Sequence, residues 1–188
     1  MRVHPAHYAP GTCFHIYNHA VDDRDLFCDP GDYKTYLHFL EQQITQDFSI
    51  ISYCLMPNHF HFLIRQNTTK PVSLLLEQPN KRYARYFNHK YSRKGRLFQS
   101  KLQHKVLLEN SYLINVCAYI HANPLAARLV DKPEDWEYSN FPDFMGLREG
   151  GMFSQEFVMM WLPDRLKYRQ LVMEVADHRG SGLAREFY

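Results

Sequence analysis

The sequence predicts an α+β fold in which helices pack against one antiparallel sheet. Segments rich in β-branched and aromatic residues alternate with segments whose apolar residues recur at helical spacing. Two of the predicted strands are separated by a turn of only a few residues, which is typical of antiparallel neighbours. With 188 residues, 45% hydrophobic and 22% charged, the chain suits one domain with an appendage.

The N-terminal part is predicted to contain three strands and one helix. Residues 12–20 are strand formers, and alternation places His15 and Tyr17 on one face of this strand. The run Asp-Pro-Gly-Asp at 29–32 opens a helix whose apolar pattern continues to about residue 46. Residues 48–55 and 59–65 then form a hairpin, because Pro and Asn in the turn between them favour chain reversal.

The next elements are a helix and a strand. Residues 72–91 show helical spacing, and we expect Pro79 to break or kink this helix, so that its well-formed part begins near Asn80. A fourth strand lies within residues 97–108, interrupted near Ser100.

A third helix is predicted over residues 109–123, with Asn110 or Ser111 as its N-cap and Pro124 at its end. The resulting order is β-α-β-β-α-β-α. This order is the pattern of a ferredoxin-like or RRM-like sheet, βαββαβ, with one further helix.

The chain changes character after Val130. Residues 131–139 are expected to be extended and held by Trp136 and Tyr138, and two short helices are expected over 154–162 and 164–176. The last dozen residues are expected to be mobile. We therefore divide the chain into a domain over residues 1–146 and a small helical C-terminal extension over residues 147–188.

The segment Met56-Pro-Asn-His-Phe-His-Phe-Leu-Ile64 contains the most informative pattern of the sequence. Alternation along a strand places His59 and His61 on one face and Phe60, Phe62 and Ile64 on the other. Two imidazoles on one rigid face can converge on a metal ion. The alternative is that the motif occurs by chance, which is common in a chain with 11 histidines. In that case one histidine would lie on the surface and the other in the core.

Charge is concentrated in one segment. Residues 81–105 contain nine of the 22 Lys and Arg residues and none of the 20 Asp and Glu residues. Aromatic residues are interleaved with these charges, and basic residues with aromatic faces are typical of nucleic-acid binding. The alternative is a solvated helix face whose aromatics, Tyr83 and Tyr86 among them, pack into the core. The candidate phosphate contacts are Lys81, Arg82, Arg85, Arg93, Lys94 and Arg96.

Several classes of protein are not indicated. No apolar run is long enough to span a bilayer, and the N-terminal residues do not resemble a signal peptide. The four cysteines are far apart in sequence and are expected to be reduced core thiols. We expect a cytoplasmic protein, and the family resemblance described below implies that it is bacterial and nucleoid-associated.

The third predicted helix carries Tyr119 and Asn123. Residues four apart share a helix face, so a phenol and an amide carbonyl project together and suit phosphoryl transfer at a metal. The alternative is an ordinary half-buried tyrosine. Tyr86 is a rival nucleophile, but its partner four residues later is Lys90, which cannot bind a metal.

Five motifs occur in an order that resembles the REP-associated tyrosine transposases, a branch of the single-tyrosine HUH transposases. They are Pro57-Asn-His-Phe-His61, Arg85-Tyr-Phe-Asn88, Leu97-Phe-Gln99, Tyr119-Ile-His-Ala-Asn-Pro-Leu-Ala-Ala-Arg-Leu-Val130 and Trp136-Glu-Tyr-Ser139. The resemblance extends from about Thr12 to about Gly146. It implies a ferredoxin-like domain with a nucleophilic tyrosine on a helix downstream of the sheet.

The resemblance implies roles for individual residues. His59 and His61 match the HUH histidines that bind a divalent cation, Tyr119 matches the nucleophile, and Asn123 matches a third metal ligand four residues later. His121 departs from the common pattern and should point away from Tyr119. The implied partner is single-stranded or hairpin-forming repetitive DNA, and the implied state is a monomer or a homodimer.

The expected activity is a metal-dependent DNA endonuclease and strand transferase that forms a 5′-phosphotyrosine. Two imidazoles and one amide leave coordination positions open, which suits Mg²⁺ or Mn²⁺ better than a closed zinc site. Three alternatives stay open: an RRM-like binding module without catalysis, a metal-dependent nuclease that uses water, and a domesticated transposase that serves its host.

Overall fold

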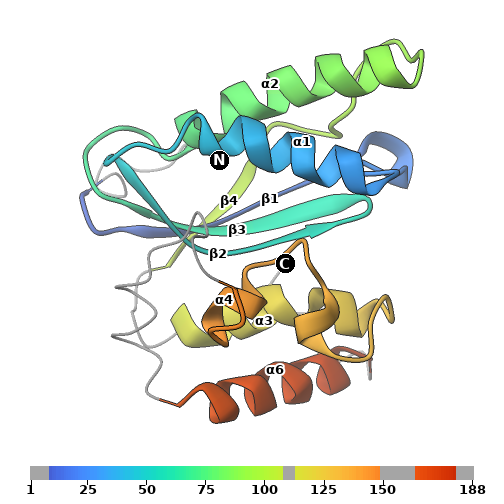
Figure 1. The fold of residues 1–188 in the computed structure, drawn as a ribbon. Helices are drawn as coiled ribbons and strands as arrows, with labels where there is room; N and C mark the ends of the chain where they lie inside the picture. The colour runs from blue at the N-terminus through green and yellow to red at the C-terminus, as the bar shows by residue number, and fades with distance from the viewer. Residues whose placement is uncertain (1–8, 108–112, 149–163, 181–188) are drawn as a thin grey trace.

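The computed structural model describes residues 9–107, 113–148 and 164–180. At its centre is a four-stranded antiparallel sheet (Figure 1) formed by β1 (Cys13–His19), β2 (Phe48–Met56), β3 (His59–Gln66) and β4 (Gln103–Leu107). The strands lie in the order β2-β3-β1-β4. This is the order of a ferredoxin-like sheet, so the predicted fold class is confirmed, and it places β1 beside β3 in the middle.

Helices cover both faces of the sheet (Figure 1). Helices α1 (Pro30–Glu41) and α2 (Ser73–Lys90) pack on one face. The other face carries α3 (Leu113–Ala126), the short α4 (Phe141–Phe144) and α6 (Arg165–Gly180), with α3 between the sheet and α6. Two single 3₁₀ turns, η2 (Val21–Asp23) and η4 (Pro133–Asp135), complete the described secondary structure. The described residues therefore form one core on each face of the sheet, and α6 adds a further layer outside α3.

The alternation predicted for β3 is observed. Phe60, Phe62 and Ile64 lie in the core under α1 and α2. Leu63 belongs to the core under α3, so His59 and His61, four and two residues before it, lie on that same face. The predicted faces of β1 are confirmed in the same way, because Phe14 and Ile16 belong to the core under α1 and α2.

Two proline predictions are wrong. Pro79 lies inside α2, which is continuous from Ser73 to Lys90. Pro124 lies inside α3, which continues to Ala126. Both prolines are buried, so the packing of their rings and of the surrounding helix faces offsets the hydrogen bond that each removes.

The predicted clamp at Trp136 and Tyr138 is observed, but the segment over 131–139 is not extended throughout, because Pro133–Asp135 forms the 3₁₀ turn η4. Leu55 N donates to Tyr138 O (2.9 Å), and Trp136 Nε1 donates to Leu55 O (3.0 Å). The Tyr138 ring stacks on Tyr33 of α1 with 3.7 Å between ring centroids. Residues 136–140 therefore cover the exposed edge of β2.

Other predicted boundaries differ or lie outside the described residues. Helix α1 ends at Glu41 rather than near residue 46, because tight turns lead from it into β2. Helix α6 continues to Gly180, so residues 177–180 are helical rather than part of a mobile tail. The predicted N-cap at Asn110 or Ser111, the helix over 154–162 and residues 181–188 are outside the described part of the chain.

Candidate functional site

Polar side chains gather between the sheet and α3, in the layer where apolar packing is usual. The register of β1 and β3 pairs His19 with His59 and Tyr17 with His61. The imidazoles of His59 and His61 have ring centroids 5.0 Å apart and an interplanar angle of 84°. Both predicted HUH histidines therefore lie side by side on the face that α3 covers.

The two imidazoles are held through the same ring nitrogen. His59 Nδ1 lies 2.7 Å from Asn58 Oδ1, and His61 Nδ1 lies 3.1 Å from His15 Nε2. The Nε2 atom of each ring is buried and makes no hydrogen bond of ordinary geometry with the described residues. Because a buried nitrogen without a partner is rare, both Nε2 atoms are available to a further ligand.

Burial determines the charge state of these histidines. Desolvation lowers the pKa of His59 to about 4, with a further contribution from neighbouring His19. Desolvation also lowers the pKa of His15 to about 4 and that of His61 well below its usual value. All three imidazoles are therefore neutral near pH 7, which is the form that coordinates metal ions.

Helix α3 brings the predicted tyrosine and amide to the same place. The Tyr119 ring centroid is 5.9 Å from that of His61, in an edge-to-face arrangement. Asn123 Nδ2 donates to the carbonyls of Tyr119 and Ile120, both at 3.0 Å. The Asn123 side chain also lies near His59, where it raises the pKa of that imidazole against the larger lowering by desolvation.

The residues at the site fit a divalent metal as a partial ligand set. Among the described residues, no three His, Cys, Asp or Glu side chains are arranged as a metal cluster. The donors that converge are instead two imidazoles with unpartnered Nε2 atoms and the Asn123 carbonyl. Such a set suits a catalytic ion that keeps positions for water and substrate oxygens.

Sequence reasoning missed Arg179, which comes from α6. Its guanidinium carbon lies 4.2 Å from the centroid of the Tyr119 ring, and its Nη1 donates to Tyr119 O at 3.4 Å. Tyr119 is only 1% exposed. No sequence signal could have identified Arg179, because the contact depends on how α6 packs on α3.

Sequence reasoning also missed His15 and His19 as members of the cluster. The His19 ring stacks on His59 with centroids 4.9 Å apart, and His15 bonds to His61. The alternation of residues 12–20 placed His15 on a common face with Tyr17. The missing information was that this strand would lie directly beside β3.

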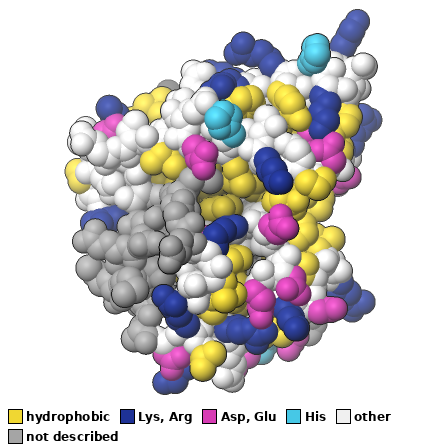
Figure 2. Space-filling view, in the orientation of Figure 1, with side chains coloured by type: hydrophobic (Ala, Val, Ile, Leu, Met, Phe, Trp, Pro, Cys, Tyr) yellow, Lys and Arg dark blue, Asp and Glu magenta, His cyan; other side chains and the backbone are white. Residues whose placement is uncertain are grey.

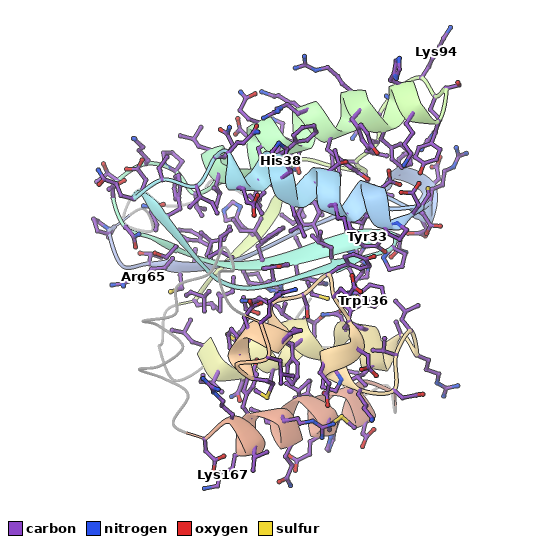
Figure 3. All side chains as sticks on the ribbon, in the orientation of Figure 1. Tyr33, His38, Arg65, Lys94, Trp136 and Lys167 are labelled. Carbon is purple, nitrogen blue, oxygen red and sulfur yellow. The ribbon has the colours of Figure 1, made fainter. Side chains whose placement is uncertain are left out.

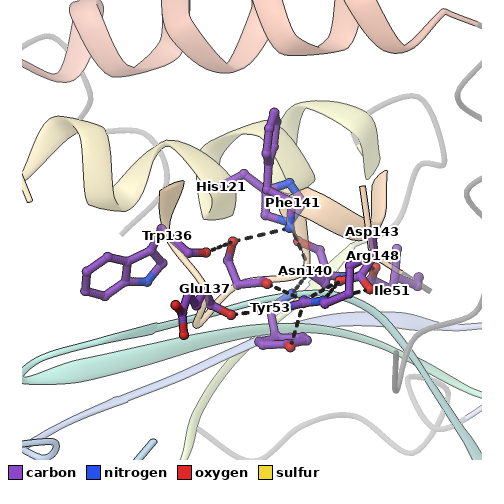
Figure 4. A network of polar contacts seen from close by, with 11 residues as sticks. Ile51, Tyr53, His121, Trp136, Glu137, Asn140, Phe141, Asp143 and Arg148 are labelled. Carbon is purple, nitrogen blue, oxygen red and sulfur yellow. Dashed lines mark hydrogen bonds and ion pairs between the residues drawn. The ribbon is translucent and has the colours of Figure 1, made fainter. Parts of the chain in front are cut away.

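His121 belongs to a different network (Figure 4). Its Nε2 lies 2.9 Å from Asn140 Oδ1 and 3.1 Å from Ser52 Oγ, and its Nδ1 lies 2.7 Å from Tyr168 Oη. Asn140 in turn bonds to the backbone of Ile51 and Tyr53 in β2. Both ring nitrogens are thus engaged, and His121 connects α3 to the sheet and to α6 rather than joining Tyr119.

The predicted phosphate contacts lie away from this site. Lys81, Arg82 and Arg85 are on α2, which covers the opposite face of the sheet, and Lys94 lies in the loop beyond it (Figure 3). Figure 2 shows Lys and Arg side chains gathered over α2 at the top of that view. Within the described residues, the side chains of three of the six make no hydrogen bond, ion pair or aromatic-ring contact: Lys81, Arg85 and Lys94.

The other three predicted contacts have partners in the fold. Arg82 bonds to Gln42 and lies over the ring of Phe39, Arg93 lies over the Phe87 ring, and Arg96 donates to the Gln99 carbonyl. The structure brings one part of the basic segment near the histidines, because Gln99 N donates to His19 O (2.9 Å). The basic segment therefore runs from α2 around the end of β1.

The interleaved tyrosines of α2 serve the core. Tyr83 is fully buried and donates to Leu26 O. Tyr86 donates to Asp32 Oδ1 at 3.1 Å, on the α1 side of the sheet. Neither ring is arranged for base stacking, and Tyr86 is separated from the histidine pair by the sheet.

Comparisons with known proteins agree with this fold. The model of the family "Transposase IS200 like" matches residues 14–123, which include both histidines, Tyr119 and Asn123. The chain belongs to this family. Comparison with curated proteins gives no significant match.

A solved structure, "Structure of the REP associates tyrosine transposase bound to a REP hairpin", is similar to the whole fold. It matches with a TM-score of 0.64 and 15% sequence identity, over 82% of this chain and 98% of that chain. At this identity the likeness concerns the fold alone. No helix among the described residues is long and apolar enough to cross a membrane.

Proposed function

We propose that this IS200-like transposase is a metal-dependent single-stranded DNA endonuclease and strand transferase that acts through a covalent 5′-phosphotyrosine at Tyr119. The observation that carries the proposal is the meeting of the His59–His61 pair with Tyr119 in one buried layer, 5.9 Å between the His61 and Tyr119 rings. This arrangement joins a cation site to a nucleophile, as phosphoryl transfer requires.

Three side chains are assigned to the metal. His59 and His61 would bind it through Nε2, and Asn123 through Oδ1, because these atoms face the site without other strong partners. When bound, Mg²⁺ or Mn²⁺ supplies a positive charge that polarises the scissile phosphate and offsets charge on the leaving oxygen.

Tyr119 is the assigned nucleophile. Its oxygen attacks phosphorus in line, the bond from phosphorus to the 3′ oxygen breaks, and the downstream fragment of the strand is retained through its 5′ phosphate as a phosphotyrosine. The phenolic proton is released to water, and the leaving oxygen becomes a 3′ hydroxyl by taking a proton. A 3′ hydroxyl can later reverse the step, so strand rejoining needs no external energy source.

Access to Tyr119 requires a local movement. The ring is 1% exposed and is covered by the Arg179 guanidinium. A scissile phosphate reaches the phenol only after the Arg179 side chain has left the ring. Arginine binds phosphate well, so the displaced side chain is suitably placed to contact the same phosphate.

The proposed substrate is single-stranded or hairpin-containing DNA of the repetitive extragenic type. The structurally similar transposase is described as bound to a REP hairpin. In this chain, the exposed Lys81, Arg85 and Lys94 and the segment that leads from them to His19 offer a basic surface for the backbone. A domesticated enzyme and a mobile one would share this chemistry.

The arrangement argues against an RRM-like binding module. Such modules stack bases on aromatic side chains of an open sheet face. Here α1 and α2 cover one face of the sheet and α3 covers the other. The strand positions that would hold stacking aromatics on the α3 side hold His59 and His61 instead.

The test is incubation with single-stranded DNA containing hairpins from repeats near the source gene, with Mg²⁺ or Mn²⁺, followed by a denaturing gel. Wild type is expected to give a metal-dependent protein–DNA adduct. Tyr119→Phe should abolish the adduct, and the matched variant Tyr86→Phe should retain it. Cleavage without an adduct that survives Tyr119→Phe would favour a water-using nuclease, and binding without cleavage would favour a binding module.

A further inference from the structure

The hydrogen bond between His15 and His61 suggests a role for a residue outside the assigned ligand set. His15 is 3% exposed, and its Nε2 lies 3.1 Å from His61 Nδ1. His15 comes from β1 and His61 from the neighbouring β3, so both imidazoles are carried by rigid central strands. Their rings are nearly parallel, with centroids 5.2 Å apart.

The two predicted metal-binding histidines are held in matching ways. Asn58 Oδ1 is an acceptor, so the His59 Nδ1 that lies 2.7 Å from it must carry the ring proton. This leaves the lone pair of His59 on Nε2, the atom without a partner. For His61 to present Nε2 in the same way, its Nδ1 must also donate, and the acceptor within reach is His15 Nε2.

We infer that His15 is a positioning residue that fixes the tautomer and the ring orientation of His61, so that the Nε2 lone pair of His61 points into the cation site. This inference rests on the proposed metal site. The groups beyond a metal's direct ligands commonly change its affinity by about 10–100-fold when removed. Here the group is a neutral imidazole that accepts a hydrogen bond, in place of the more usual carboxylate or carbonyl.

The first experiment reads the tautomer in the metal-free wild-type protein. Long-range ¹H–¹⁵N NMR correlations distinguish a proton on Nδ1 from one on Nε2. The expected result is His61 protonated on Nδ1, with His15 Nε2 unprotonated. A His61 ring protonated on Nε2 would overturn the inference, whatever the behaviour of any variant.

The second experiment measures the Mn²⁺ dissociation constant by the electron paramagnetic resonance signal of free Mn²⁺. His15→Phe is expected to raise this constant by about 10–100-fold, because it removes the acceptor from His61. His15→Gln keeps an acceptor at a similar reach and should stay within about threefold of wild type. His104→Phe, an exposed position on β4, is the matched control and should leave the constant unchanged.

The outcomes separate this inference from the proposed function. At saturating Mn²⁺, His15→Phe should regain adduct formation, whereas a merely damaged site would stay inactive. Unchanged Mn²⁺ affinity in His15→Phe would contradict the role of His15 and leave the metal site standing. Failure of the wild type to bind Mn²⁺, with the same result for His61→Ala, would contradict the metal site itself and the inference with it.

Discussion

Among single residues, His61 and His121 illustrate how the surroundings of a buried histidine decide its function. His61 has one engaged nitrogen and one without a partner, and His121 has two engaged nitrogens. Both are buried and neutral, because desolvation lowers the pKa of each. Only His61 therefore retains a nitrogen that can accept a metal.

The role of His121 can be tested by substitution. His121→Phe should lower the free energy of unfolding by about 2–4 kcal/mol, because it leaves the buried partners Asn140 and Tyr168 incompletely bonded. Its Mn²⁺ affinity should match that of wild type. Urea unfolding and Mn²⁺ titration measure the two effects, with the exposed His89→Phe as control for stability.

Weakened Mn²⁺ binding in a folded His121→Phe protein would contradict this separation of roles. The sequence predicted only that His121 points away from Tyr119, from helix geometry. Its partners could not be predicted, since Ser52 is 69 residues earlier and Tyr168 is 47 residues later in the chain.

At the scale of elements, α2 combines two kinds of basic residue that the sequence does not distinguish. Lys90 lies 2.6 Å from Asp29 and 2.7 Å from the fully buried Asp32, and so ties the end of α2 to the start of α1. Arg85, one and a half turns earlier, is exposed and bonds to none of the described residues. The local charge pattern is the same, but only one of the two is free to bind DNA.

Substitution of Arg85 should therefore affect DNA binding, and substitution of Lys90 should affect stability. Arg85→Gln should weaken DNA binding and leave stability unchanged. The slope of log association constant against log salt concentration should decrease in magnitude by about one. Lys90→Met should lower the free energy of unfolding, because the buried Asp32 loses its counter-charge. Fluorescence anisotropy at several salt concentrations and urea unfolding are the measurements.

An Arg85→Gln protein that binds DNA with wild-type affinity and slope would place the DNA elsewhere on the surface. Lys94→Met provides a control for the stability effect, since Lys94 is exposed and makes no ion pair with the described residues.

The two prolines show that packing between elements can override local sequence rules. Local rules place a break at Pro79 and an end at Pro124, but helix packing against the sheet overrides both.

For the molecule as a whole, burying neutral histidines makes the stability of the fold depend on pH. His15, His61 and His121 are each at most 3% exposed, and desolvation is the main cause of their lowered pKa values. In the unfolded chain these side chains titrate near pH 6.5. Between that value and about pH 4, the unfolded chain binds protons that the folded protein does not.

The sign of the pH dependence follows. Stability should be constant with respect to these groups above pH 6.5 and should fall as the pH decreases toward 4, by about 1.4 kcal/mol per pH unit for each such histidine at most. Replacing His121 with Asn should reduce this slope by the contribution of one histidine, at most about 1.4 kcal/mol per pH unit. Urea unfolding from pH 7.5 to pH 4.5, without divalent metal, measures the slope, and stability independent of pH in this range would contradict the burial of neutral histidines.

The sequence predicted the sheet, the order of the elements along the chain and the faces of β1 and β3, because these depend on residue alternation and helical spacing. It also predicted the pairing of Tyr119 with Asn123, which depends on helix spacing. It could not predict that α6 would place Arg179 on Tyr119, since that contact is tertiary and no motif marks residues 165–180. Local patterns thus define the elements that carry the proposed site, and long-range packing determines how they are covered.

The central claim is that Tyr119 forms the covalent link to DNA. The most direct measurement is to trap the Mn²⁺-dependent adduct of the wild-type protein on a hairpin-containing single strand, digest both components and identify the modified peptide by mass spectrometry. We expect a nucleotide attached through its 5′ phosphate to Tyr119, in a peptide that also contains Asn123. A nucleotide attached to Tyr86 or to another side chain, or cleaved DNA with no modified peptide, would contradict it.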